Sequence, residues 1–231
     1  MIYVTGDLHG EIGRFQSDGM KQLRKGDTLL VCGDFGFVWD GSAAEKKLLQ
    51  KLGKKKYQIL FVPGCHDNYD LLQEYPEVDF SGGRARQISG GVYELLRGEI
   101  YTVEDKRIFA FGGGVSEDEH LREEGKTWWR EELPAEEEYE TAIERLSEYE
   151  NEVDYIVTHD ASGAMKQFLN MEQQDSELGK IHAFLNVISK RVKFEAWFFG
   201  RYHQDKLIPP RYYAMFQSVL KAPGQEQAKK K

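Results

Sequence analysis

Five short polar segments contain the aspartate and histidine residues that could bind metal ions. Each segment follows an apolar run, and the five are residues 6–10 (GDLHG), 33–36 (GDFG), 64–68 (GCHDN), 158–160 (THD) and 200–203 (GRYH). Four of the six histidines of the chain lie in these segments. Carboxylate oxygens and imidazole nitrogens suit divalent ions such as Mn²⁺, Fe²⁺ or Zn²⁺. Each motif alone is weak evidence, but their ordered recurrence predicts a metal site.

The spacing of these residues indicates how they could share ions. Asp7 and His9 are separated by one residue and can chelate a single ion from a strand end. Asp34 has two carboxylate oxygens and could bridge two ions. Two ions roughly 3.5–4 Å apart can activate a water molecule and stabilise both oxygens of an in-line displacement. Phosphoryl transfer is the reaction that most needs such charge neutralisation.

The apolar runs before these segments are typical of buried β-strands. We expect strands at residues 2–5, 28–32, 58–62, 107–111, 155–158 and 196–199. Continuous apolar runs of this length suit strands that are covered on both faces. In open α/β sheets, ligands collect beyond the carboxyl ends of the strands. The polar segments are therefore expected to meet at one edge.

Helical patterns separate several of these strands. They cover residues 43–52, 134–149 and 177–191, the last with Leu178, Ile181, Leu185 and Ile188 on one stripe. Residues 92–111 are instead typical of an antiparallel meander. We predict a mixed α/β fold with two packed sheets in a single domain over residues 1–221. Residues 222–231 (APGQEQAKKK) are predicted to form a disordered polar tail.

Composition limits the classes of function. The net charge of −8 argues against a general nucleic-acid backbone binder, which normally carries a basic face. The two cysteines, Cys32 and Cys65, imply no disulfide framework. The sequence shows no leader pattern and no 18-residue apolar stretch, so we expect a cytoplasmic location with no membrane span.

The ordered motifs resemble those of the calcineurin-like metallophosphoesterase family. That family carries Asp-X-His, Gly-Asp, Gly-Asn-His-Asp/Glu, His and then Gly-His-X-His, and the resemblance here runs from Asp7 to His203. It implies a four-layer α/β/β/α sandwich, with two mixed β-sheets packed face to face and helices outside. It also implies a metal-dependent phosphoester hydrolase, either a phosphatase or a phosphodiesterase.

The resemblance assigns roles to individual residues. It implies that Asp7, His9, Asp34 and His203 hold the first metal, that Asp34 bridges, and that His159 binds the second. It also implies that His66 steadies the phosphate or protonates the leaving oxygen, with Asp67 orienting His66.

Two departures from the family pattern affect the second metal. Cys65 stands where the family has an asparagine ligand, and Arg201 stands at the first histidine of Gly-His-X-His. Three interpretations remain open. Cys65 could ligate a softer ion as thiolate, Arg201 could replace the metal with a fixed charge that clamps a phosphate oxygen, or the second ion could be lost and activity reduced.

The predicted function is thus hydrolysis of a phosphoester with one or two divalent ions per chain, Mn²⁺ or Fe²⁺/Zn²⁺. The alternative is a catalytically impaired binding or regulatory module. Substrates could be phosphoproteins, nucleotides or other phosphoesters, whereas long nucleic acids and membranes are not expected partners. Arg122 is a candidate substrate clamp, weighed against a surface ion pair. Trp128 and Trp129 could serve a subunit contact, because two adjacent indoles cannot both face one core.

Overall fold

A computed structural model describes residues 1–169 and 179–225 of the chain. Two mixed β-sheets form its centre. The first has seven strands in the order β13-β1-β2-β3-β6-β5-β4, and the second has six in the order β11-β12-β10-β9-β8-β7.

The strands of the first sheet are β1 (Ile2–Thr5), β2 (Thr28–Cys32), β3 (Gln58–Val62), β4 (Glu77–Phe80), β5 (Gly83–Ser89), β6 (Val92–Leu95) and β13 (Leu220–Lys221). Those of the second are β7 (Ile100–Val103), β8 (Lys106–Phe111), β9 (Tyr155–Thr158), β10 (Ala196–Phe199), β11 (Lys206–Ile208) and β12 (Tyr212–Ala214). The helices are α1 (Asp18–Lys21), α2 (Ala43–Gly53), α3 (Tyr69–Gln73), α4 (Glu136–Glu148), α5 (Gly163–Leu169) and α6 (Lys180–Arg191), with 3₁₀ turns η1 (Ile12–Gln16), η2 (Glu119–Leu121) and η3 (Arg130–Glu132).

The predicted strands are confirmed, and the central ones run parallel. β1, β2 and β3 pair in parallel in one sheet, and β8, β9 and β10 do so in the other. Only β8 differs from its predicted range, since it begins one residue earlier, at Lys106. Parallel pairing directs the carboxyl ends of each group of strands to one edge, which is where the polar segments begin.

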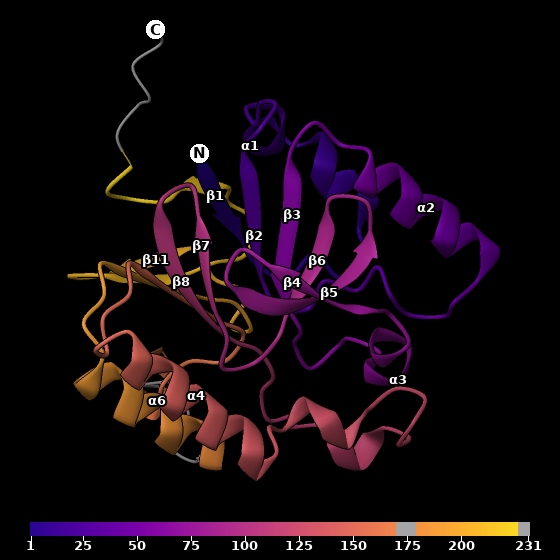
Figure 1. Ribbon diagram of the computed structural model, residues 1–231. Coiled ribbons are helices and arrows are strands. Elements are labelled where there is room, and N and C mark those ends of the chain that lie inside the picture. The colour runs from indigo at the N-terminus through magenta and orange to yellow at the C-terminus, as the bar shows by residue number, and fades with distance from the viewer. Residues whose placement is uncertain (170–178, 226–231) are drawn as a thin grey trace, which may run out of the picture.

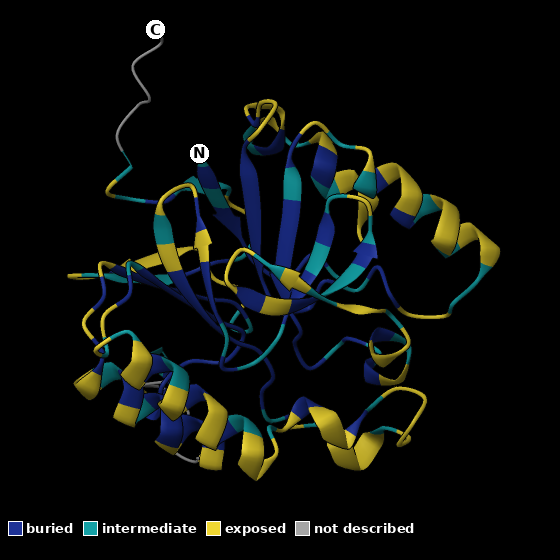
Figure 2. Ribbon diagram, viewed as in Figure 1, coloured by how far each residue is buried: buried dark blue, intermediate teal, exposed yellow. Residues whose placement is uncertain are grey.

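Three apolar clusters explain why the strands are apolar on both faces. Side chains of the two sheets, such as Leu30 and Val157, pack against each other in the middle cluster. The alternate residues of β2, Leu29 and Val31, face the cluster that α2 covers. On the far side, α4 and α6 cover the second sheet. The predicted four-layer α/β/β/α sandwich is therefore confirmed, and Figures 1 and 2 show its buried strands between helices exposed on their outer faces.

The predicted helices also form, with small shifts at their ends. The first extends one residue further, to Gly53, and its N-terminus is capped by Ser42, whose hydroxyl oxygen accepts a hydrogen bond from the Glu45 amide at 3.1 Å. The second begins two residues after Pro134. In the third, Ile181, Leu185 and Ile188 are buried as the stripe requires, while Leu178 lies outside the described residues.

The predicted antiparallel meander over residues 92–111 is wrong in part. β7 and β8 do form an antiparallel hairpin. β6, however, belongs to the other sheet, where it pairs in parallel with β3 and antiparallel with β5. The chain crosses between sheets at residues 96–99. Periodicity could not reveal this crossing, because each strand alternates in the same way whichever sheet it joins.

The predicted start of the disordered tail also needs correction. Ala222 is buried, and its amide donates to the carbonyl of Ile2 at 3.0 Å. The Gln225 side chain accepts from the Ile2 amide at 2.6 Å and donates to the Ile2 carbonyl at 2.9 Å. The ordered domain therefore reaches at least residue 225, and the rest of the predicted tail lies outside the described residues. No helix within the described ranges is long and apolar enough to cross a membrane.

Candidate metal centre

The five polar segments meet at the carboxyl edge of both sheets, as the sequence predicted. Four of them, all but residues 6–10, line a cavity of about 440 Å³. Its lining includes Asp34, Cys65, His66, His159, Arg201 and His203 from these segments, together with Ser116, Glu117, Asp118, Arg122 and Tyr202. Segments up to 194 residues apart in the chain contact each other there.

The backbone at this edge is strained. Ten non-glycine residues of the described chain have positive φ, and five of them are site residues: Asp7 at 41°, His9 at 46°, Asp34 at 45°, Arg201 at 67° and His203 at 48°. This left-handed conformation is uncommon for residues with a Cβ and costs about 1–3 kcal/mol each. Such a concentration of strained residues at the strand ends is typical of a functional site.

Glycines next to the ligand residues allow a close approach. A Cβ at Gly33 would lie 2.0 Å from His159 Nδ1, and one at Gly64 would lie 2.2 Å from Asp34 Oδ1. Real Cβ atoms do not come this close, so any larger residue would push the candidate ligands apart.

The first candidate ligand group consists of Asp7, Asp34 and His159. His159 Nδ1 lies 3.5 Å from Asp7 Oδ1, and His159 Nε2 lies 3.5 Å from Asp34 Oδ1. The carbonyl of Cys32 accepts a hydrogen bond from His159 Nδ1 at 3.2 Å, which leaves the Nε2 lone pair free. Asp7 Oδ2 and His159 Nε2 are buried and have no hydrogen-bond partner. Unpaired buried acceptors are costly, and a cation between them would satisfy both.

The second group consists of His9, Asp34 and His66, and so shares Asp34 with the first. His9 Nε2 lies 3.8 Å from Asp34 Oδ2 and 3.1 Å from His203 Nε2. His203 Nε2 in turn lies 4.0 Å from Asp7 Oδ2. Two imidazole nitrogens and two carboxylates thus converge, which fits a divalent ion with mixed nitrogen and oxygen ligands.

The electrostatics of the buried carboxylates favour cation binding. Burial raises the pKa of Asp7 well above its usual range, and the negative charge of Asp34 raises it further. Burial also tends to raise the pKa of Asp34, but His159 and His66 outweigh this and hold it below its usual range. Burial lowers the pKa of His159, which favours the neutral imidazole that binds metal ions.

Comparison with protein-family models gives a match over residues 1–200, to the calcineurin-like phosphoesterases. The chain belongs to this family. A comparison with curated proteins gave no match. The matched range ends at Gly200, so the segment of this phosphoesterase that carries Arg201 and His203 lies just beyond it. Family membership and the two ligand groups together establish a metal-dependent phosphoesterase in general terms.

Cys65 and Arg201 lie where the family resemblance places ligands of a second metal. Arg201 Nη1 donates to Cys65 Sγ at 2.7 Å, Nε lies 3.3 Å from Asp160 Oδ2, and Nη2 donates to the carbonyl of Val115. Burial disfavours the charge of Arg201, yet neighbouring Cys65 and Asp160 raise its pKa, so the guanidinium stays charged. Burial raises the pKa of the Cys65 thiol. Cys65 belongs to neither ligand group.

His66 is held through both ring nitrogens. Nδ1 lies 2.8 Å from Asp34 Oδ2, and Nε2 lies 2.5 Å from Arg122 Nη2. The hydrogen bond to Asp34 raises the pKa of His66, while burial and the Arg122 charge lower it. A guanidinium only donates, so Nε2 must accept in this arrangement. The protonation of His66 therefore depends on whether Arg122 or a substrate oxygen faces Nε2.

The role predicted for Asp67 has to be corrected. Asp67 does not contact the ring of His66. Its carboxylate accepts hydrogen bonds from the amides of Phe35 at 3.2 Å, Gly36 at 2.8 Å and Gly64 at 2.9 Å. Asp67 therefore ties together the two loops that carry Asp34 and His66, and it is Asp34 that orients His66.

The structure also places Arg122, Trp128 and Trp129, which the sequence analysis singled out. Arg122 lines the cavity and forms an ion pair with Asp118 at 2.9 Å, so the ion pair is confirmed and the substrate clamp stays a prediction. Trp129 is buried and donates to Asp70 at 2.9 Å, whereas Trp128 is half-buried. Trp129 therefore packs within its own chain.

Sequence reasoning missed several supporting residues. Asp160 is fully buried and accepts from His182 Nε2 at 3.1 Å and from the Tyr202 hydroxyl at 2.8 Å. Its position directly after His159 was the available signal. Arg14 donates to the carbonyl of Asp7 at 3.2 Å and lies over the ring of Phe216, which stacks on His203 at 4.6 Å. Nothing in the local sequence around Arg14 indicates this.

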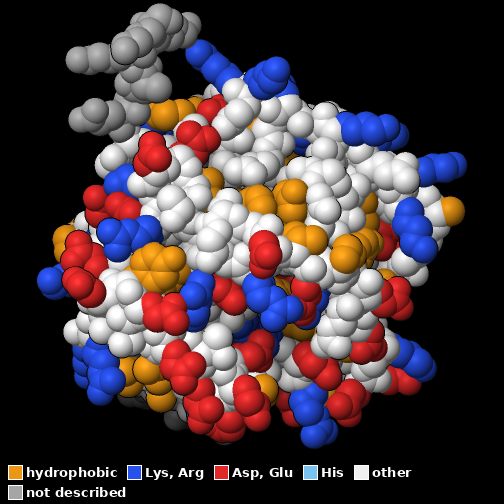
Figure 3. Space-filling view, viewed as in Figure 1, with side chains coloured by type: hydrophobic (Ala, Val, Ile, Leu, Met, Phe, Trp, Pro, Cys, Tyr) orange, Lys and Arg blue, Asp and Glu red, His pale blue; other side chains and the backbone are white. Residues whose placement is uncertain are grey.

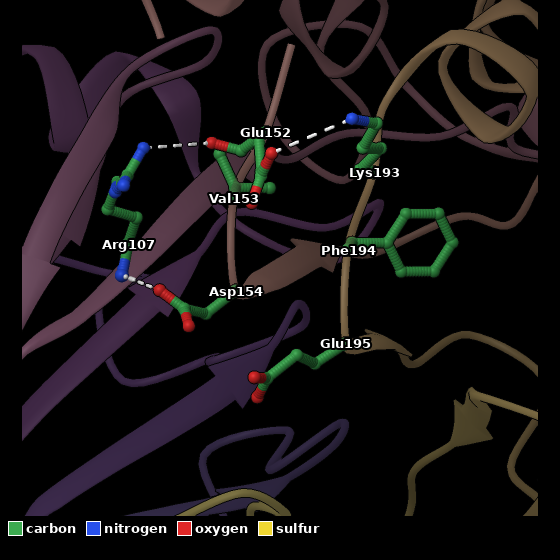
Figure 4. A pocket seen from close by; sticks show the side chains of 7 residues that line it. All are labelled: Arg107, Glu152, Val153, Asp154, Lys193, Phe194 and Glu195. Atoms are coloured by element: carbon green, nitrogen blue, oxygen red, sulfur yellow. Dashed lines mark hydrogen bonds and ion pairs between the residues drawn. The ribbon is translucent and has the colours of Figure 1, made fainter. Parts of the chain in front are cut away.

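A second cavity, of about 240 Å³, lies at the amino edge of the second sheet (Figure 4). Its three carboxylates, Glu152, Asp154 and Glu195, already have partners. The Arg107 amide donates to Asp154 at 2.7 Å, and Lys193 lies 3.9 Å from Glu152. It has no convergent ligand group, so the carboxyl-edge cavity is the better candidate for the chemistry.

Proposed function

We propose that this chain hydrolyses phosphoesters, as a phosphatase or phosphodiesterase, with a metal-activated water. The observation that carries the proposal is the pair of unsatisfied buried atoms, Asp7 Oδ2 and His159 Nε2, which form one candidate ligand group with Asp34 at the strand ends. The donor set fits a divalent ion such as Mn²⁺, Fe²⁺ or Zn²⁺. When bound, that ion would lower the pKa of a water molecule and neutralise phosphoryl charge.

The protein side chains would divide the remaining tasks. Asp7, His9, Asp34 and His203 would hold the first ion, and His159 lies 3.5 Å from a carboxylate oxygen of both Asp7 and Asp34. His66 Nε2 faces the cavity and would bind a phosphoryl oxygen or protonate the leaving oxygen. Arg122 already contacts that nitrogen, so an incoming phosphate would meet a guanidinium and an imidazole together.

We further propose that the substrate is a small phosphoester or a phosphorylated protein, and that the enzyme acts in the cytoplasm. The face in Figure 3 mixes acidic and basic side chains over the β4–β5 hairpin and α4. The net charge of −8 agrees with this, because a long nucleic acid would require a basic surface.

The test is turnover of p-nitrophenyl phosphate and bis-p-nitrophenyl phosphate with Mn²⁺, Zn²⁺ or Fe²⁺. We expect hydrolysis of at least one ester, lost on chelation and reduced about 10²- to 10⁴-fold in His66→Ala. His120→Ala is the matched control, since His120 lies outside the ligand groups.

The competing function is a binding or regulatory module that keeps the pocket without turnover. The altered pair Cys65 and Arg201 favours it, because both lie on the second-metal side. Absence of turnover with all three metals, in protein that still binds metal, would establish this alternative.

A further inference from the structure

The two residues that depart from the family motifs contact each other. Arg201 Nη1 donates to Cys65 Sγ at 2.7 Å, although the residues are 136 positions apart. A hydrogen bond between them means that the two changes act as one unit in the folded protein. They are therefore not independent losses at one site.

The guanidinium of Arg201 is held in a fixed position. Its Nη2 donates to the carbonyl of Val115, and its Nε lies 3.3 Å from Asp160. Asp160 is fully buried and is itself held by the Tyr202 hydroxyl, His182 Nε2 and the Ala161 amide. A planar donor with this many partners has little freedom to leave.

The guanidinium of Arg201 places a positive charge at the position where the family resemblance expects a second ion. The sulfur of Cys65 already accepts from Arg201, and Cys65 belongs to neither ligand group. The positive charge of Arg201, whose Nη1 lies 2.7 Å from Cys65 Sγ, would also repel a divalent ion bound beside Cys65. Arg201 lines the same cavity as His66, His159 and His203, so its remaining donors are available to a phosphoryl oxygen.

We propose that the chain binds one divalent ion, and that the guanidinium of Arg201 provides the second positive charge that a substrate phosphate meets. The role in substrate binding rests on the proposed function, whereas the number of ions can be measured independently of turnover. Arginine suits this role because it binds tetrahedral oxyanions through directed hydrogen bonds and keeps its charge when buried.

The first experiment counts ions. Chelator-stripped protein is titrated with Mn²⁺ by calorimetry and its metal content is measured by elemental analysis. We expect one equivalent in the wild type and in Cys65→Ala, and two in the double variant Cys65→Asn with Arg201→His. Two equivalents in the wild type, or none in Cys65→Ala, would overturn the proposal, since the latter result would make the thiol a ligand.

The second experiment measures binding of inorganic phosphate to the Mn²⁺-loaded protein. Loss of a charge-assisted hydrogen bond in Arg201→Gln should weaken phosphate binding about 10- to 100-fold, and Arg201→Lys should recover part of it. Unchanged affinity in Arg201→Gln would contradict the role. Thermal melting of each variant checks folding, and Arg201→Lys, which keeps the charge, serves if Arg201→Gln does not fold.

The outcomes separate the two proposals. One ion with phosphate binding but no hydrolysis would refute the proposed hydrolase and leave the role of Arg201 intact. Hydrolysis with two ions in the wild type would do the reverse.

Discussion

Buried polar atoms are partnered differently on the two sides of Asp34. On one side, Asp7 Oδ2 and His159 Nε2 are buried without a hydrogen-bond partner. On the other, Asp160 is equally buried, yet its carboxylate contacts Arg201, His182 and Tyr202. On our proposal, Asp7 and His159 therefore require a bound cation, whereas Asp160 already has a positively charged partner in Arg201.

On our proposal, the guanidinium of Arg201 takes the place of one metal ion within the family fold. Arg201 has the same left-handed backbone conformation as Asp7 and His203. A buried guanidinium needs a buried carboxylate, so the replacement depends on Asp160 as much as on Arg201.

The largest expected effect comes from Asp34, which both ligand groups share. Asp34→Asn should lower kcat/KM by at least about 1000-fold, well beyond the 10- to 100-fold typical of residues behind the ligands. Steady-state kinetics and metal analysis measure this, with Asp79→Asn on β4 as the control. Wild-type metal content in Asp34→Asn would contradict its place at the centre of the site.

Where Asp160 pairs with Arg201, Asp160→Asn should destabilise the protein. It removes the counter-charge of a buried guanidinium, a change that costs on the order of 3–5 kcal/mol. Urea denaturation measures the loss. Asp118→Asn, which removes the more exposed partner of Arg122, is the matched control and should change stability far less.

The same variant predicts a pH effect. Burial alone would raise the pKa of Asp160, but the Arg201 charge and the hydrogen bond from His182 hold it below its usual range. Such a carboxylate contributes stability above its unfolded pKa of about 4, and that contribution is lost as the pH falls. Asp160→Asn should therefore show a smaller loss of stability below about pH 4 than the wild type.

At Asp7, the expected effect of pH on stability has the opposite sign to that at Asp160. The folded pKa of Asp7 is raised by burial and by Asp34, so the metal-free protein should lose stability as the pH rises above the usual carboxyl pKa of about 4. Metal-free Asp7→Asn should be more stable than the metal-free wild type at pH 8, by on the order of 1–2 kcal/mol. Denaturation with and without Mn²⁺ tests this. A metal-free Asp7→Asn variant that is less stable than the metal-free wild type would contradict this difference between Asp7 and Asp160.

The smallest effect is expected at Arg122, which contacts His66 but neither ligand carboxylate. Arg122→Gln should raise KM about 10-fold through loss of a charge-assisted contact and leave the metal content unchanged. An unchanged KM would assign Arg122 to its ion pair with Asp118 alone.

Much of this protein follows from the sequence because its signals are local. An apolar strand followed by glycine and a polar residue is readable one segment at a time, and so the strands and their edge were predicted correctly. The common edge follows from parallel pairing, which is why Asp7, Asp34, His159 and His203 could be placed together. Family resemblance then supplied their expected roles.

Only the tertiary structure decided which residues touch within that edge. It placed Arg201 against Cys65, gave Asp67 to the backbone amides of two loops, and put β6 and β7 in different sheets. These outcomes depend on contacts between segments distant in the chain, and a local pattern is the same whichever partner a side chain finds. The sequence thus predicted the candidate metal ligands and the fold that gathers them, while the tertiary structure placed the guanidinium of Arg201 beside them.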